Sequence, residues 1–593
     1  MKSVSQSTVH PAHANRTLVL FDTSLRPAGS TSSCSIATVP TSLRPFGQRR
    51  SKYSSRMTWL SVQPDGGYYL VGAKAARKSP FEGDGMGTVS ALDRLLTRTK
   101  ALELSTGFTE PFYDIDVAND LMLPARSDQG ASNRGMVKRM AAGGCAPALV
   151  FEKAMKLTPS HKLCGFGAIV LVAMTIASRN FSRMGEPAFI IPLSVAGVAY
   201  LLAIRELLSA QKLPKHVIVF GLGLAALWHF QFLRMPSGPD DDIHRYVWDG
   251  RVQRLGFNPY VLVPSDPALA GLHTTETRTL NNPEVASPYP PGAQLFFRAV
   301  TTMHESTFAL KVVFVICDLA IVFVLLDVLR RTGQGEHWVL AYAWHPLLAT
   351  EVAGSGHVDI VGVLLLLVSA AAFVRSWRAV AAIAFGLAIA VKLLPLVLLP
   401  LYWKRLRVRD GALAAIVLAL LYVPFLDHGR IPFGSLGTYV QRFRFNDPVF
   451  ATLERVTVPQ VVAGLAVLVG FLTAIWMRRR YAEWSLDTFA WPMAASLLCA
   501  PVIYPWYMLW LLPFLRSTTN LPILIWTLSI IPTYYVWRLR TLGQPWVVPG
   551  WIMVLEYGSV VVAAAIIALL RGSRSGTLPC SRDRVGQSPS QIT

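Results

Sequence analysis

The sequence predicts an all-α polytopic membrane protein with about 12–14 membrane-spanning helices. Hydrophobic residues make up 52% of the 593 residues, whereas charged residues make up only 15%. A soluble globular chain carries about 25% charged residues. The mean hydropathy is +0.40 although the first part of the chain is polar. These values argue against a collagen-like fibre, a coiled coil, a small secreted protein and an ordinary soluble enzyme.

The distribution of basic residues supports the same fold class. The formal net charge is +21, but Lys and Arg gather in the N-terminal part and in short clusters between apolar runs, such as 404–407 and 478–480. Such clusters are typical of cytoplasmic loops. We therefore expect membrane lipids as partners and no nucleic acid. The six cysteines show no CxxC or metal-ligand spacing, so no disulfide framework is expected.

Residues 1–154 form a segment rich in Ser, Arg, Gly and Pro, without an apolar run long enough to span a bilayer. The first residues also lack the apolar core of a signal peptide. We expect this segment to be a disordered cytoplasmic extension, or to result from a translation start placed too far upstream, since an apolar run follows Met155. No function is assigned to it. Residues 572–593 are expected to be a cytoplasmic tail.

The membrane domain is predicted at 155–571, where apolar segments follow one another. The predicted spans are 163–178, 187–207, 216–233, 306–330, 337–350, 357–374, 379–403, 411–426, 459–477, 485–500, 504–516, 520–537 and 548–570. The stretch 379–403 contains Lys392 and Pro395 and is expected to be broken into two half-helices.

The basic clusters orient these spans. With a break in 379–403, all the clusters between spans fall on one side, which the positive-inside rule makes cytoplasmic. The opposite side then receives the loops 236–292, 351–359, 427–459 and 501–505, which hold most of the acidic and aromatic residues outside the N-terminal segment. We therefore expect a protein of the plasma (inner) membrane with cytoplasmic termini and an extracytoplasmic active site.

The most informative segment begins with three adjacent aspartates at 240–242, directly after the third predicted span. Pro239 and Asp240 predict a helix start, and acidic residues suit its first turn. At helical spacing, one face then carries Asp242, Arg245, Tyr246 and Asp249. Adjacent carboxylates repel one another, so one pKa should rise and that group could act as a general base. The alternative is a helix cap with a solvated acidic turn.

These residues carry a resemblance. The stretch 240–264, DDDIHRYVWDGRVQRLGFNPYVLVP, resembles the first outer loop of the GT-C superfamily of polytopic glycosyltransferases. It is most similar to glycosyltransferase family 87 and related bacterial mannosyltransferase-like proteins. Further matching pieces are SPYPPG at 287–292, WHP at 344–346, Glu351, GHVD at 356–359, KLLP at 392–395 and YPWY at 504–507. Three predicted spans precede the acidic loop, whereas the simplest GT-C layout has one.

The resemblance implies a GT-C-like bundle and an inverting transfer. A hexose, by family habit mannose, would move from a polyprenyl-phosphate donor to an extracytoplasmic glycan or lipid acceptor. One carboxylate of the first outer loop would deprotonate the acceptor hydroxyl. The alignment puts this base at Asp242, with Asp241 as the next candidate, and no cofactor is expected.

Cations are expected to bind the donor phosphate, because guanidinium and ammonium groups suit phosphate oxygens. The candidates are Arg245, Arg251 and Lys392. Lys392 lies in an apolar run, where a charge is costly and typical of a functional site, although a lysine that reaches the interface is the alternative. For Arg442 and Arg444, a lipid headgroup or a carboxylate is the favoured partner.

The remaining candidates are expected to bind substrate. They are Tyr246, Asp249, Asn258, Tyr260, Glu351, His357, Asp359, Trp506 and Tyr507. Glu351, His357 and Asp359 could hold a divalent metal, but a hydrogen-bond network is favoured. For the aromatic residues, an interfacial belt is the alternative to sugar stacking.

A second hypothesis is a transporter or flippase for a lipid-linked sugar. Transporters often show internal repeats and paired broken helices around a site at the membrane midplane. Here 392–395 gives one break, and neither a second break nor a repeat is apparent. A third hypothesis, a non-catalytic scaffold, would have only the segment 1–154 as a docking region.

Overall fold

The computed structural model describes residues 158–210, 212–238, 242–481 and 485–575, together with four short strands and Thr97 before them. The chain divides into two compact units, Met1–Ala154 and Met155–Thr593.

The first unit contains a small β-sheet. Its strands are β1 (Thr17–Val19), β2 (Thr58–Val62), β3 (Tyr68–Ala73) and β4 (Thr106–Phe108), in the order β1-β3-β2-β4. Strand β3 pairs antiparallel with β1 and β2, and β2 pairs parallel with β4. The prediction of disorder over 1–154 otherwise falls outside the described residues.

The second unit is helical, which confirms the predicted fold class. Within the described residues, seven helices are long and apolar enough to cross a membrane. They are α5 (Pro159–Arg179), α6 (Pro187–Ser209), α7 (Lys215–Leu233), α10 (Thr307–Arg331), α16 (Val408–Tyr422), α19 (Pro459–Arg480) and α23 (Gly550–Ser575). Only 17% of the apolar window of α16 or α23 is buried inside the protein, so these two helices lie at the edge of the bundle.

Shorter helices fill the space between these spans. Two apolar ones, α13 (Asp359–Val374) and α14 (Arg378–Val391), form a pair. Helix α14 ends just before Lys392, and the chain continues as η9 (Leu394–Leu398) and α15 (Leu399–Tyr402). The break predicted in 379–403 is therefore confirmed, because Pro395 cannot supply the backbone N–H that a continuing helix needs.

Four predicted spans are built from short pieces instead of continuous helices. Prolines start several of these pieces, including Pro346, Pro505 and Pro522, because proline suits only the first turn of a helix. The pieces are η7 (Glu336–Trp338), α11 (Val339–Ala343), α12 (Pro346–Leu348), the π-helical η8 (Ala349–Ser355), η11 (Leu486–Thr488), α20 (Ala490–Leu498), η12 (Pro505–Trp510), η13 (Leu512–Phe514), η14 (Thr518–Asn520), α21 (Leu521–Ser529), η15 (Ile531–Tyr534) and α22 (Tyr535–Thr541).

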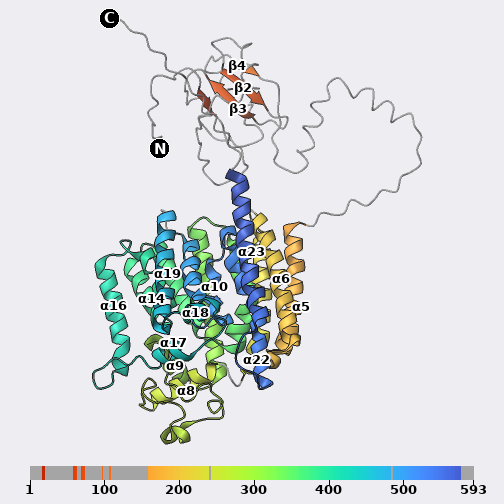
Figure 1. The fold of residues 1–593 in the computed structure, drawn as a ribbon. Coiled ribbons are helices and arrows are strands. Elements are labelled where there is room, and N and C mark those ends of the chain that lie inside the picture. Colours follow the sequence, from red (N-terminus) through yellow and green to blue (C-terminus); the bar gives the residue numbers. More distant parts are fainter. Residues whose placement is uncertain are drawn as a thin grey trace, which may run out of the picture. The chain divides into compact units, whose positions relative to one another are not determined.

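The polar loops between the spans carry short helices of their own. These are η5 (Phe181–Arg183), α8 (Ile243–Arg254), η6 (Pro267–Leu272), α9 (Pro291–Met303), η10 (Val423–Phe425), α17 (Leu436–Arg442) and α18 (Pro448–Leu453). Figure 1 shows α8 and α9 at the end of the bundle opposite the beginning of α5 and the end of α23. The two ends of the membrane domain are therefore on the side away from α8. The predicted extracytoplasmic location of the α8 end stays a prediction.

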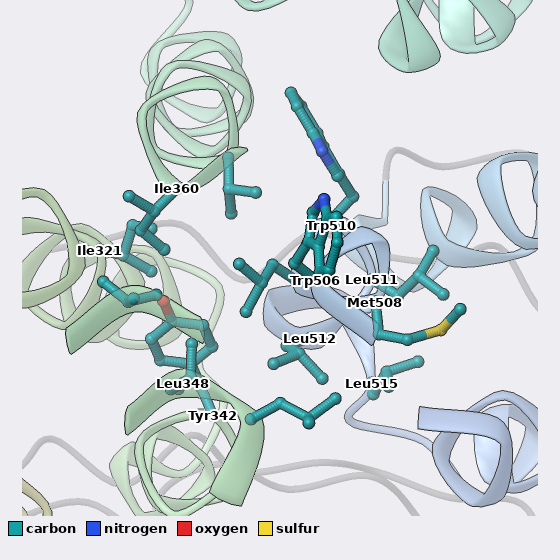
Figure 2. Close-up of a cluster of buried hydrophobic side chains, with 14 of the residues drawn as sticks. Ile321, Tyr342, Leu348, Ile360, Trp506, Met508, Trp510, Leu511, Leu512 and Leu515 are labelled. Atoms are coloured by element: carbon teal, nitrogen blue, oxygen red, sulfur yellow. The ribbon is translucent and has the colours of Figure 1, made fainter. Parts of the chain in front are cut away.

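A buried aromatic cluster holds η12 against the centre of the bundle. Figure 2 shows Trp506 and Trp510 of η12 together with Ile321 of α10, Tyr342 of α11 and Ile360 of α13. A Cβ atom on Gly362 of α13 would come within 2.2 Å of the Trp510 ring, so only glycine admits this close approach. This packing fixes the position of η12 and of the polar residues that α13 begins with.

Candidate functional site

Asp242 caps the N-terminus of α8, where the chain leaves α7. Its Oδ1 accepts a hydrogen bond from Asn281 Nδ2 at 2.8 Å and its Oδ2 accepts one from Tyr289 Oη at 3.0 Å. The side chain keeps 22% of its surface exposed. Burial raises the pKa of the Asp242 carboxyl, although Asn281, Tyr289 and Lys392 each lower it. The carboxylate is thus oriented by two donors and still open to a substrate. Asp241 lies outside the described residues.

His357 lies beside Asp242 in the turn between η8 and α13. Its Nε2 is 3.1 Å from Glu351 Oε2, and its Nδ1 is 4.0 Å from Asp242 Oδ2. The ring is only 2% exposed, and Nδ1 has no hydrogen-bond partner among the described residues. Burial and the Lys392 charge lower the pKa of His357, which favours the neutral ring. A neutral ring that donates Nε2–H to Glu351 presents the Nδ1 lone pair toward Asp242.

Gly356 makes this turn possible. Its φ angle of +81° lies in the left-handed region, and a Cβ atom there would come within 2.5 Å of Ile243 Cδ1. The Gly-His-x-Asp element therefore needs its glycine both for the backbone conformation and for close approach to the start of α8.

Trp506 supports His357 and is not free to stack on a sugar. Its ring lies parallel to that of His357 with centroids 4.0 Å apart, and parallel to that of Tyr504 with centroids 4.2 Å apart. Both faces of the indole are therefore covered, so the predicted sugar stacking would first require one of these rings to leave. The position of Trp506 below the imidazole restricts how His357 can turn.

Lys392 forms a second polar group with Asp359. Its Nζ donates to Asp359 Oδ1 at 2.6 Å, and Trp510 Nε1 donates to the same oxygen at 2.7 Å. The ammonium also lies 3.7 Å from the centre of the Tyr507 ring, whose hydroxyl is 2.6 Å from that of Tyr439. Lys392 thus has a carboxylate partner within the bundle. With 24% of its side chain exposed, it also has donors left for an anion.

The other two predicted phosphate ligands are engaged elsewhere. Arg245 Nε donates to Asp249 Oδ1 at 2.8 Å, and both side chains are buried. Asp249 Oδ2 accepts further bonds from Ser287 and Gln294. Arg251 pairs with Glu305 at 2.7 Å, and Arg444 with Glu454 at 2.6 Å, which agrees with the carboxylate alternative for Arg444.

Four residues predicted to bind substrate have structural contacts. Tyr246 is fully buried and stacks on Phe297. Asp249 joins α8 to α9 through the network just described. Asn258 Nδ2 donates to the Phe425 carbonyl at 2.8 Å, and Tyr260 Oη donates to the Tyr289 carbonyl at 2.7 Å. These four are placed around the Asp242 loop rather than in contact with the carboxylate.

Tyr260→Phe tests this structural role. The substitution removes the hydroxyl that holds the Tyr289 carbonyl, and an intramolecular hydrogen bond contributes about 0.5–1.5 kcal/mol to stability. We expect a lower Tm of the purified full-length protein in detergent, measured by differential scanning fluorimetry. Tyr481→Phe, at a half-exposed ring with no comparable bond among the described residues, should leave Tm unchanged. Equal Tm values for the two variants would contradict the role of Tyr260.

Sequence reasoning missed Asn281, Tyr289, Tyr439 and Lys311. Tyr289 lies in the Ser-Pro-Tyr-Pro-Pro-Gly element, but no role was assigned to its hydroxyl. Lys311 is buried in α10, and its Nζ donates to the Met235 carbonyl at 2.6 Å. A cation within an apolar span was the signal that could have drawn attention to it.

The three predicted metal-ligating candidates do not converge. Glu351 pairs with His357, whereas Asp359 pairs with Lys392. Within the described part of the chain, no group of three His, Cys, Asp or Glu side chains is placed to hold a metal ion. The expectation of no cofactor stays a prediction.

Comparison with known families gives one match. Residues 165–405 match the family model of the alpha-(1→6)-mannopyranosyltransferase N-terminal domain, a group related to glycosyltransferase family 87. The matched segment contains Asp242, Tyr289, His357 and Lys392, and it confirms the resemblance expected from the motifs. No curated protein and no solved structure matches the chain. The match supports glycosyltransferase activity in a helical membrane protein.

Proposed function

We propose, from the match of residues 165–405 to the mannosyltransferase N-terminal domain, that this protein transfers a mannosyl residue from a polyprenyl-phosphate donor to a hydroxyl of a glycan or lipid. The observation that carries the proposal is the Asp242 carboxylate: it is oriented by Asn281 and Tyr289, partly exposed, and has a raised pKa. A group of this kind suits general-base catalysis. We place the reaction on the extracytoplasmic side.

The proposed reaction is a single displacement. Asp242 takes the proton of the acceptor hydroxyl as its oxygen attacks the anomeric carbon from the face opposite the phosphate. The bond between that carbon and the phosphate oxygen breaks, and the polyprenyl phosphate leaves with the electron pair. Attack from the opposite face inverts the anomeric configuration. The proton on Asp242 then passes to water, because the carboxyl is partly exposed.

Lys392 is the cation best placed to bind the leaving phosphate. It acts on the pKa values of both Asp242 and His357, so its charge lies close to both groups. Asp359 and the Tyr507 ring hold its ammonium while other N–H donors stay available. Arg245 and Arg251 are bound to carboxylates, which makes them weaker candidates for this role.

His357 would accept a hydrogen bond from a substrate hydroxyl. Its Nδ1 is buried, has no partner within the described residues and is directed toward the base. An unpaired buried acceptor is costly, and a substrate donor would remove that cost. Glu351 and Trp506 hold the ring in this orientation.

The test uses the full-length protein in liposomes with a tritiated mannosyl polyprenyl phosphate and a series of hydroxyl acceptors. We expect a new, alkali-stable mannosidic bond in the acceptor, with the opposite anomeric configuration to the donor. Movement of the labelled donor across the bilayer without a new bond would overturn the proposal and favour the transporter hypothesis.

A further inference from the structure

A hairpin of exposed apolar residues follows α16 at the end of the bundle that carries α8. It comprises residues 426–434 and is called the α16 hairpin below. Two backbone bonds close its turn, from Asp427 N to Arg430 O at 3.0 Å and from Arg430 N to Asp427 O at 2.8 Å. His428 and Gly429 both have positive φ angles, as a tight two-residue hairpin turn requires. The turn is therefore a defined structure and not an irregular loop.

The arms of this hairpin expose large apolar side chains. Leu426 is 44% exposed, Ile431 is 50% exposed and Phe433 is 66% exposed. Scattered apolar residues on a surface are normal, but these belong to one nine-residue segment. The turn itself carries exposed cationic groups, His428 and Arg430. Apolar arms next to a cationic turn are the composition of a segment that lies at a lipid interface.

The exposed apolar surface is continuous with the outer face of α16. That helix packs on α14 and exposes Ile416 and Leu420, which by its length and composition face lipid. Val423, between the helix and the hairpin, is also 56% exposed. Figure 1 shows α16 at the margin of the bundle, with its following loop at the α8 end. A surface that begins in the hydrocarbon region thus continues into the hairpin without a polar interruption.

The base of the hairpin is attached to the loops around Asp242. Asn258 donates to the Phe425 carbonyl, and Ser435 Oγ donates to the Ala286 carbonyl at 2.7 Å. A Cβ atom on Gly434 would come within 2.0 Å of the Ser287 carbonyl oxygen, so the two segments are in direct contact. The depth of the hairpin is therefore set relative to the Asp242 loop.

We propose that the α16 hairpin lies in the interfacial region of the leaflet on the α8 side, with its apolar arms among the upper acyl chains and its turn near the lipid phosphates. The contact holds the Asp242 loop at a constant height above the hydrocarbon region. This inference concerns lipid contact and does not depend on the reaction that the site catalyses.

The test measures spin-label accessibility in nanodiscs containing anionic lipid, with full-length protein from which the six native cysteines have been replaced. Labels are placed by Phe433→Cys, by Ile416→Cys as a lipid reference and by Glu284→Cys as an exposed reference on the neighbouring loop. We expect the label at 433 to collide more often with oxygen than with a water-soluble nickel chelate, as at 416. The order at 284 should be the reverse.

Two results would overturn the proposal. Preferential collision with the nickel chelate at 433 would place the hairpin in water, and protection from both reagents would show a protein contact such as a second copy of the chain. Because removal of cysteines can impair folding, the unmodified protein is also photolabelled with a lipid that carries a diazirine high on its acyl chain. We expect adducts on Ile431 or Phe433, and adducts on α16 without any on the hairpin would contradict the proposal.

Discussion

Asp242→Asn is expected to lower kcat/KM for mannosyl transfer by about 10²–10⁴-fold, the usual contribution of a general base. The amide has nearly the same shape as the carboxyl and still accepts the bond from Asn281, but it cannot take a proton from the acceptor. The fold should persist, since the substitution removes no buried apolar contact. The measurement is initial-rate transfer from a radiolabelled polyprenyl-phosphate mannose, alongside the Tm of each variant.

Asp266→Asn is the matched control for this prediction. Asp266 lies in the same loop and its side chain caps η6, a role that Asn can also fulfil. We expect activity close to that of the unmodified protein. If Asp242→Asn also kept that level of activity, Asp242 would not be the base.

The pH dependence gives a second, independent readout of the base. Asp242 must be deprotonated to act, so activity falls as the pH drops through its pKa, and burial puts that pKa above the ordinary value of about 3.9. Tyr289 donates to the carboxylate and lowers this pKa. Tyr289→Phe should therefore move the acid limb of the kcat/KM profile to higher pH. A limb that stayed in place, or moved to lower pH, would count against this assignment.

His357→Phe is expected to reduce kcat by about 10–100-fold. The phenyl ring can keep the stacking on Trp506, but it removes the Nδ1 acceptor and the Nε2 donor to Glu351. A lost hydrogen bond to a buried group costs about 1–3 kcal/mol, which corresponds to a rate change of this size. Steady-state kinetics of the purified variant measures the effect.

His273→Phe separates this role from general packing. His273 also stacks on a tryptophan, with its ring centroid 4.0 Å from that of Trp248, but within the small core formed with Leu269. The substitution exchanges a stacked imidazole for a phenyl ring at a position that does not contact Asp242. We expect nearly unchanged kcat. Equal losses in the two variants would show that His357 serves only the packing of this end of the bundle.

Several features could be predicted from the sequence because they depend on neighbouring residues. Apolar runs of sufficient length determine membrane-spanning helices such as α10, and the pair Lys392 and Pro395 determines a break wherever the segment is packed. The acidic triplet at 240–242, placed just after a span and within a recognisable motif, was sufficient to select Asp242 as a candidate base.

The partners of the site residues were decided by tertiary packing. Trp506 was a candidate for sugar stacking until two rings, one of them 149 positions away at His357, were found to cover its faces. Likewise, Asn258 bonds to the carbonyl of Phe425, which is 167 residues distant. Local periodicity determines which face a side chain occupies, but hydrogen-bond and ring partners depend on which remote helices pack together. The sequence by itself thus determined the membrane fold and the chemistry available, whereas the packed bundle decided which groups can meet a substrate.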